Sequence, residues 1–249
     1  MSRLRPRPAR MMLPSSNPLF SILRLRLLLR ERITNEPNGK IAGVKNYVAR
    51  SRKIRRLAGD MFNDMSSVPT YLATRRSGKP RDMIAPGPDT ATLGTILQLA
   101  MRTPDHGKLF PWRFVTIGDR SAFAALMQRA FVVSNPDARP SQTEAAVAHA
   151  YMAPTLVALL FAPQPSVKIP LREQQMSVGA VGMNLLHAAH AHGFVASWIT
   201  GWASYDTTVR AALCTGDEQI AGFFFIGTPS FPLEERPRPD PASIVRNWP

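Results

Sequence analysis

The feature that most constrains the fold is a stretch of about twenty residues, 171–192, whose pattern predicts one long helix. Apolar and small side chains lie on nearly every side of this helix: Met176, Val178, Gly179, Ala180, Val181, Gly182, Met183, Leu185, Leu186, Ala188 and Ala189. A helix at a protein surface carries an apolar stripe on one side only, so this one must be buried around most of its circumference. Either a large core or a second copy of the chain has to cover it.

Four further segments predict strands. Residues 154–161 and 219–226 are continuously apolar, which is typical of strands covered on both faces of a sheet. Residues 112–117 and 194–199 are shorter strand candidates. In the first of these, the alternation places Phe114 and Thr116 on one face and Val115 and Ile117 on the other.

Helix signals separate these strands. Ser66 or Ser67 can cap a first helix, with Pro69 in its first turn and Gly78 as its stop, and Asp89 caps a second helix. A third helix covers about 120–132, and a capping-box pattern at 141–144 starts a fourth helix. Residues 206–213 form a further short helix. Four strands and about six helices in mixed order predict an α+β fold around one sheet.

The net charge of +14 is distributed unevenly. Residues 1–60 hold 15 Lys and Arg against 3 Asp and Glu, whereas residues 61–249 hold 16 against 14. The folded part is therefore nearly neutral, and the nucleic-acid signature suggested by the total charge does not belong to it. A single cysteine, Cys214, excludes an internal disulfide framework and fits a reducing compartment, so we expect a cytoplasmic protein.

Residues 1–64 are predicted to be a basic extension ahead of one domain at 65–249. Arg24 and Arg26 interrupt its apolar run at 18–30, and a membrane span needs about 20 mostly apolar residues, so we expect no transmembrane helix. A clear secretory signal is also absent. The extension is interpreted as disordered or as sequence ahead of a later start; a transit peptide and a tail for nucleic acid or acidic membranes stay open.

Two basic segments are the candidates for a functional site. The loop from Arg102 to Phe114 combines two prolines, a glycine, positive charge and large aromatic side chains. A loop that only connects two elements does not need this combination of residues. Upstream, Arg75-Arg76-Ser77 offers guanidinium groups, which bind phosphate through planar, bidentate hydrogen bonds. Our hypothesis is that these segments hold a phosphorylated aromatic cofactor, although an ordinary solvated helix end would look similar to Arg75-Arg76-Ser77.

Other motifs carry less information. His187 and His190 lie at i and i+3 on one predicted helix face, where metal ligands can sit, but no carboxylate or cysteine lies close in sequence, and we predict no metal site. Residues 198–202 end a strand with a glycine and can form the floor beneath a planar ring, or simply a packed turn. Dinucleotide-binding, phosphate-loop and nucleophile-elbow motifs are missing, as they can be where a flavin carries the chemistry.

Taken in order, several short motifs resemble the nitroreductase family, specifically its short YdjA-like branch. The matching segments are Arg75-Arg76-Ser77, Pro86-Gly87-Pro88, residues 103–114, residues 172–175 at the start of the long helix, Trp198-Ile199-Thr200-Gly201-Trp202, residues 222–229 and residues 235–240. The likeness covers about residues 65–248. It implies an α+β fold with a mixed central sheet, a homodimer with a buried central helix, and FMN at the interface between the two chains.

The resemblance also implies the roles of particular residues. Arg75, Arg76 and Ser77 would contact FMN from one subunit, and Arg102 and His106 would be the loop contacts, with His106 reaching across from the partner. Trp198, Ile199 and Thr200 would line the ring or ribityl chain, and Arg236 or Arg238 would help with the phosphate. This chain departs from the family at His106-Gly107-Lys108, where many relatives carry an asparagine.

The implied activity is NAD(P)H-dependent reduction of a nitroaromatic, a quinone or a similar acceptor by a ping-pong mechanism. The flavin carries the chemistry, and no side chain is predicted to be catalytic. Two alternatives stay open. One is a flavin enzyme of the same fold with different chemistry, such as dehalogenation or flavin breakdown. The other is a non-enzymatic binding protein that uses its basic extension.

Overall fold

The computed structural model describes residues 62–248. The predictions for residues 1–61 lie outside the described residues. The elements, in chain order, are α3 (Val68–Thr74), η1 (Pro80–Asp82), β1 (Met83–Ile84), α4 (Thr90–Ala100), η2 (His106–Lys108), β2 (Trp112–Thr116), α5 (Arg120–Ser134), α6 (Pro140–Ala148), η3 (His149–Tyr151), β3 (Thr155–Phe161), α7 (Leu171–Ala191), β4 (Val195–Ile199), η4 (Trp202–Ser204), α8 (Thr207–Leu213), β5 (Gln219–Pro229) and α9 (Pro241–Ile244).

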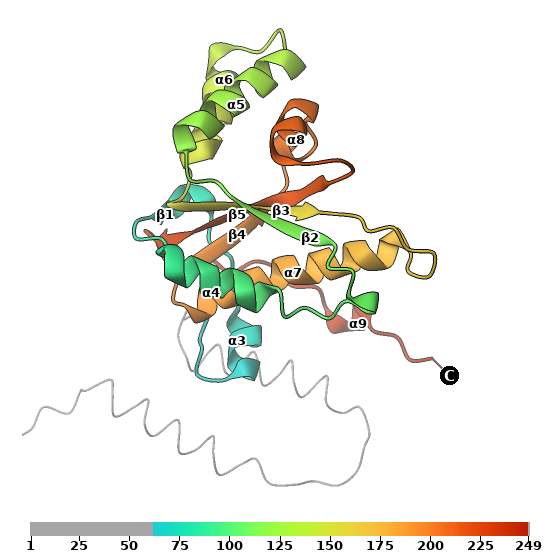
Figure 1. Cartoon of the computed structure of the whole chain (residues 1–249). Coiled ribbons are helices and arrows are strands. Elements are labelled where there is room, and N and C mark those ends of the chain that lie inside the picture. Colours follow the sequence, from blue (N-terminus) through green and yellow to red (C-terminus); the bar gives the residue numbers. More distant parts are fainter. Residues whose placement is uncertain (1–61, 249) are drawn as a thin grey trace, which may run out of the picture. The chain divides into compact units, whose positions relative to one another are not determined.

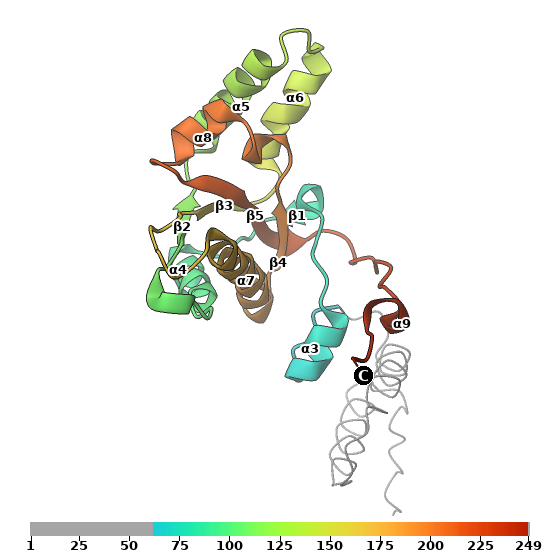
Figure 2. The same cartoon turned by 90° about the vertical axis from the view of Figure 1, so that its right-hand side faces the viewer.

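One sheet separates two layers of helices, with α5, α6 and α8 on one face and α4 and α7 on the other (Figures 1 and 2). Strands β3 and β5 lie at its centre, and their side chains alternate between the two cores. Phe223 and Phe225 pack toward α5 and α8, whereas Phe224 and Ile226 pack toward α4 and α7. All four are fully buried, which confirms that the apolar run at 219–226 is covered on both faces.

The relative directions of the strands differ from the expected ones. Every pairing between described strands is antiparallel: β1 with β5, β2 with β3, β3 with β5, and β4 with β5. The α+β class is confirmed, but the mixed sheet that we expected is not found among the described residues. Strand direction could not be read from the sequence because the central neighbours β3 and β5 are separated by α7, β4 and α8.

Helix starts were predicted better than helix ends. Ser67 and Asp89 cap their helices as expected, and Asp206, predicted as the first residue of a short helix, caps α8. Helix α3, however, ends at Thr74 rather than near Gly78, because Asn63 accepts a hydrogen bond from the Arg76 backbone amide at 2.9 Å. Asn63 also donates to the Arg76 carbonyl oxygen at 3.0 Å, so its side chain fixes the backbone that follows the helix.

Two local features were misplaced or missed. Helix α6 begins at Pro140, not after the predicted box at 141–144, because proline suits the first turn and the Arg139 amide donates to Gln142 Oε1 at 3.0 Å. Strand β1 was not predicted as a strand, since two residues give no periodic signal. It pairs with the last two residues of β5 and extends the sheet there.

A bulge in β5 makes room for an indole ring. Leu159 pairs with Gly222 and Leu160 with Ile220, so Ala221 is left over, and its carbonyl oxygen accepts a hydrogen bond from Trp198 Nε1 at 3.0 Å. A Cβ on Gly222 would lie 2.1 Å from that nitrogen. Gly222 also has a φ of 149°, which favours glycine.

Candidate functional site

The end of helix α3 brings together Arg75, Ser77 and Arg238, which form the candidate anion site. Arg75 is half-buried, and its Nη1 donates to Ser77 Oγ at 3.3 Å. From the C-terminal segment, Arg238 Nη2 donates to the Arg75 carbonyl oxygen at 3.2 Å. Burial and the nearby charge of Arg238 both lower the pKa of Arg75. Among the described residues no carboxylate pairs with Arg75, whereas Arg238 Nη2 lies 3.6 Å from a carboxylate oxygen of Glu235.

Arg76 has different surroundings from Arg75. Its Nε donates to the Glu234 carbonyl oxygen at 2.5 Å and its Nη1 to the Ser77 carbonyl oxygen at 3.2 Å. Lys79 lies close by and pairs with the Glu234 carboxylate at 2.7 Å. The guanidinium of Arg76 thus holds the C-terminal segment in place. Its predicted role as a phosphate contact stays a prediction.

Behind Arg75 lies a buried hydrogen-bonded cluster of Tyr71, His187 and His190. The Tyr71 hydroxyl is 2.7 Å from His187 Nδ1 and 2.8 Å from His190 Nδ1. Burial raises the pKa of Tyr71 to about 12, and burial together with the charge of Arg75 lowers the pKa of both histidines, that of His190 to about 3. The three side chains are therefore neutral at pH 7.

This cluster was missed in the sequence, where Tyr71 counted only as an apolar residue of the first helix. The available signal was a tyrosine one turn ahead of Arg75, together with histidines at i and i+3. Tyr71 satisfies the Nδ1 atoms of both histidines. Within residues 62–248 no three His, Cys, Asp or Glu side chains are grouped as metal ligands would be.

The loop from Arg102 to Phe114 is anchored in the core as predicted. Trp112 is buried and Phe114 half-buried, and both pack on the α4 and α7 side of the sheet. His106 lies on the surface, with its Nδ1 2.8 Å from the Glu173 carboxylate at the start of α7. Arg102 is exposed at the end of α4.

The same loop holds an unusual backbone. Gly107, Lys108 and Phe110 have φ values of 77°, 56° and 48°, a conformation that non-glycine residues rarely adopt. Asp105 supports it, because one carboxylate oxygen accepts from the Phe110 amide at 2.7 Å. At Gly107 a Cβ would lie 2.2 Å from Ile169 Cδ1, so glycine is required. Strained backbone of this kind clusters at functional sites.

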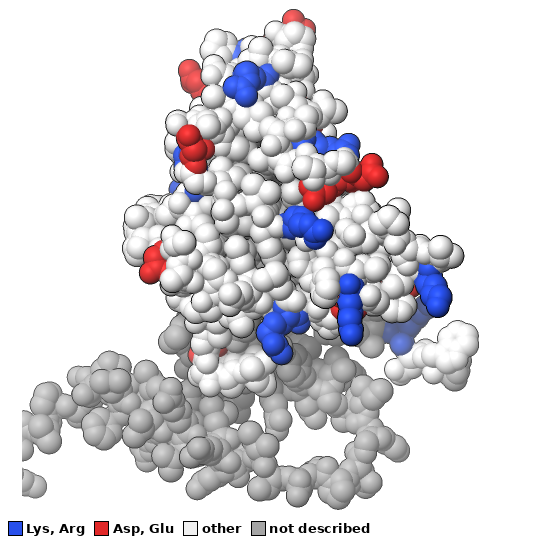
Figure 3. Space-filling model, in the orientation of Figure 1, with Lys and Arg blue, Asp and Glu red and all other residues white. Residues whose placement is uncertain are grey.

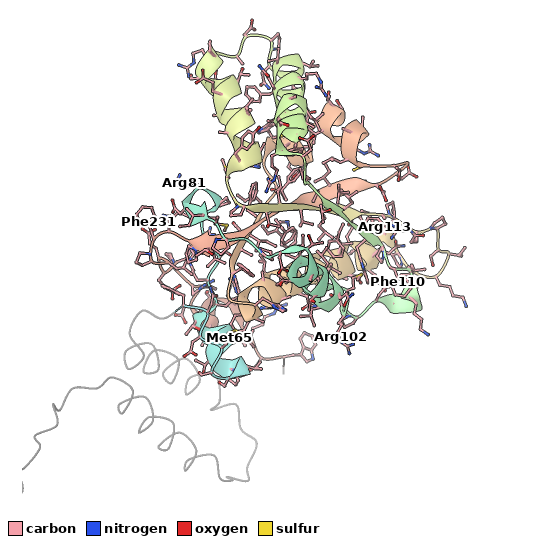
Figure 4. All side chains as sticks on the ribbon, turned by 60° about the vertical axis from the view of Figure 1, so that its left-hand side comes forward. Met65, Arg81, Arg102, Phe110, Arg113 and Phe231 are labelled. Atoms are coloured by element: carbon pink, nitrogen blue, oxygen red, sulfur yellow. The ribbon has the colours of Figure 1, made fainter. Side chains whose placement is uncertain are left out.

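The His106 part of the loop and the end of α3 lie at opposite ends of α7. The start of the loop lies nearer the end of the helix, where Asn184 Nδ2 donates to Thr103 Oγ1 at 2.8 Å. His106 contacts Glu173 near the start of the helix, whereas Tyr71, one turn ahead of Arg75, contacts His187 near its end. At 1.5 Å per residue, these contacts are about 21 Å apart along the helix axis. Figure 4 shows Phe110 of the loop on the right of the view and Arg81 on the left. A single chain does not bring His106 to Arg75.

The third predicted segment covers the last two residues of β4 and the turn that follows it. Trp198 stacks on Phe224 with ring centroids 5.2 Å apart, so much of its indole belongs to the core. Ile199 is half-buried on the other face of the sheet, and Thr200 is exposed, with its carbonyl oxygen accepting from Ser204 Oγ at 2.6 Å. Of these three residues, Thr200 offers the most accessible surface to a ligand.

An apolar surface runs along α4 and α7. The helix α7 buries one side against the sheet, but Met176 is 59% exposed and Leu171 is 56% exposed. On α4, Leu99 is also exposed, and few charged side chains lie over this helix in the view of Figure 3. The expectation that α7 is covered around most of its circumference is thus not met within one chain.

Residues 72–228 match the model of the Nitroreductase family. The chain is 31% identical over 178 residues to YdjA of Escherichia coli (strain K12), which bears the name of an NAD(P)H nitroreductase; the match covers 70% of this chain and 95% of YdjA. Among the described residues no helix is long and apolar enough to cross a membrane.

Two solved structures show the same fold. A nitroreductase-like family protein from Bacillus cereus superposes with a TM-score of 0.65 at 18% identity, covering 76% of this chain and 99% of that one. A variant of NfnB, an FMN- and NADPH-dependent nitroreductase from Sphigopyxis sp. strain HMH, superposes with a TM-score of 0.55 at 21% identity, covering 71% and 96%.

Proposed function

The chain belongs to the nitroreductase family and is an oxidoreductase, and we propose that it binds FMN and uses NAD(P)H to reduce small acceptors such as nitroaromatics or quinones. The observation that carries this proposal is the anion site at the end of α3. Arg75 and Arg238 lie close together there, beside the Ser77 hydroxyl and without a carboxylate partner for Arg75 among the described residues.

This site fits the phosphate of FMN. Burial and, after it, the charge of Arg238 make the charged form of Arg75 unfavourable, as its lowered pKa indicates, and a bound anion would relieve this. Arg238 has the Glu235 carboxylate as a partner at 3.6 Å, whereas Arg75 has no carboxylate partner among the described residues. A phosphate is the anion that two forked guanidinium groups and a hydroxyl bind well. The FMN dependence named for NfnB supports the same cofactor here. In this proposal Arg75, Ser77 and Arg238 hold the phosphate, and Thr200 and Ile199 lie along the remainder of the cofactor.

The complete site needs two chains. His106 and Arg102 belong to the loop that the family resemblance places on the flavin, yet His106 lies about 21 Å from the Arg75 end of α7. A second copy packed on the exposed surface of α7 would cover Met176 and Leu171, and it would bring its own loop to this chain's anion site. We therefore propose a homodimer with FMN at the interface and His106 supplied by the partner.

When bound, FMN supplies the redox chemistry, taking a hydride from NAD(P)H and delivering electrons to the acceptor. The protein's part is to hold and orient. Arg75 and Ser77 fix the phosphate, and the positive charge of Arg102 near the ring would stabilise its reduced, anionic form. Because both substrates would use the same open face of the flavin in turn, the proposed kinetic order is ping-pong. The proposed location of the protein is the cytoplasm.

The test is FMN retention by Arg75→Ala. Hydrogen bonds to a charged group contribute about 1.5–3 kcal/mol, so the Kd for FMN should rise by about 10- to 100-fold. Arg129→Ala is the matched control, since Arg129 is an exposed arginine on α5, on the other face of the sheet. Wild-type affinity in Arg75→Ala would show that the phosphate assignment is wrong.

A further inference from the structure

The hydroxyl of Tyr71 joins two helices through two histidines. Tyr71 lies on α3 and is 6% exposed, and His190, near the end of α7, is 2% exposed. The hydroxyl bonds both His187 and His190, and its ring meets theirs edge to face at centroid distances of 5.3 and 5.9 Å. A polar cluster this well buried and this well bonded fixes the geometry of the elements that it joins.

The protons of the cluster can be assigned from its hydrogen bonds. A tyrosine hydroxyl has one proton to donate, so with two neutral imidazoles it donates to one Nδ1 and accepts from the other. His190 Nε2 is buried with no hydrogen-bond partner among the described residues. A buried N–H without a partner is costly. His190 therefore carries its proton on Nδ1 and donates to Tyr71, and Tyr71 donates to His187.

Arg75 depends on this arrangement. It lies four residues after Tyr71, one helical turn further along, directly where α3 ends and the backbone turns away. The charge of Arg75 acts on Tyr71, His187 and His190 alike, so the four groups share one environment. Beyond Arg75 lies Arg238 of the C-terminal segment.

We propose that Tyr71 is a positioning residue of the anion site, which, through His187 and His190, holds the end of α3 on α7 and keeps Arg75 in place for the phosphate. This inference rests on the proposed FMN site. Tyr71 itself does not touch the cofactor. Because the cluster is neutral, it positions Arg75 without adding a positive charge to that of Arg238.

The experiment compares the affinities of FMN and riboflavin, which lacks the phosphate, for the full-length protein. Tyr71→Phe keeps the ring and removes the hydroxyl. The loss of one hydrogen bond that positions a charged group should raise the Kd for FMN about fivefold and leave the Kd for riboflavin unchanged within twofold. Tyr205→Phe, an exposed tyrosine, is the control and should change neither value.

A matched pair at His187 gives an independent test, because this histidine is only half-buried. His187→Gln keeps an acceptor for the Tyr71 hydroxyl and should preserve the preference for FMN. His187→Leu removes the acceptor and should reduce the preference for FMN over riboflavin to the same extent as Tyr71→Phe.

The outcomes separate this inference from the proposed function. If Arg75→Ala lowers the preference for FMN over riboflavin but Tyr71→Phe and His187→Leu do not, the positioning role is wrong and the phosphate site stands. Equal weakening of FMN and riboflavin by Tyr71→Phe would indicate a role in stability alone and would also refute positioning. If Arg75→Ala leaves the preference unchanged, both proposals are wrong.

Discussion

Acid should destabilise the fold through His190. Burial, the charge of Arg75 and the neighbouring His187 lower the pKa of His190 to about 3, against about 6.5 for a histidine in an unfolded chain. The folded state then binds fewer protons than the unfolded state between these values. The stabilisation is therefore fully present above pH 6.5 and is lost as the pH falls from about 6.5 toward about 3.

The size of the effect follows from proton linkage. Integrated from pH 7.5 to pH 5.0, a single histidine with these two pKa values reduces the free energy of unfolding by about 2 kcal/mol. The lowered pKa values of His187 and His149 act in the same direction, so the wild-type protein should lose more than this in total.

The assay is urea unfolding of the full-length protein at both pH values, without added flavin and at one protein concentration. His190→Met cannot titrate, so the difference between its two free energies should be smaller than that of the wild type by about 2 kcal/mol. His192→Met, at an exposed position two residues later, is the control and should behave as the wild type. An unchanged pH dependence in His190→Met would refute the assignment of a neutral, buried His190.

Three further predictions concern packing and assembly. A Cβ at Gly182 would lie 2.9 Å from the Trp198 ring, so Gly182→Ala should lower the free energy of unfolding by about 1–3 kcal/mol in urea titrations, and an unchanged value would contradict the packing. Met176→Asp places a carboxylate on the exposed apolar surface of α7 and should yield monomers that lose FMN in light scattering and absorbance; a dimer that keeps its flavin would contradict the proposed interface. His106→Ala removes an exposed hydrogen bond to Glu173, so stability should change by less than about 1 kcal/mol while FMN retention falls, and retention equal to the wild type would remove His106 from the site.

Much of the fold could be predicted because its signals are local. The apolar run of β5 and the capping residues Ser67 and Asp89 act within one element, and each was identified correctly. The direction of the strands depends on pairing between segments far apart in the chain. The two-residue strand β1 forms because β5 provides a partner, so no local sequence pattern predicts it.

The candidate site shows the same division. Arg75 and Ser77 were selected from residue types at a helix end, and the structure joins them by a hydrogen bond. Arg75 and Arg76 contact different residues because the C-terminal segment, more than 150 residues away in sequence, packs against them. The sequence around the two arginines does not predict these contacts. Tyr71 was overlooked because its hydroxyl acquires a role only when α3 lies against the end of α7.

The most direct test of the central claim is the absorbance spectrum of the purified full-length protein after incubation with FMN and desalting. We expect the two visible bands of bound oxidised flavin, and we expect NAD(P)H to bleach them when oxygen is excluded. A preparation that stays colourless after this treatment would contradict the FMN site at Arg75, Ser77 and Arg238.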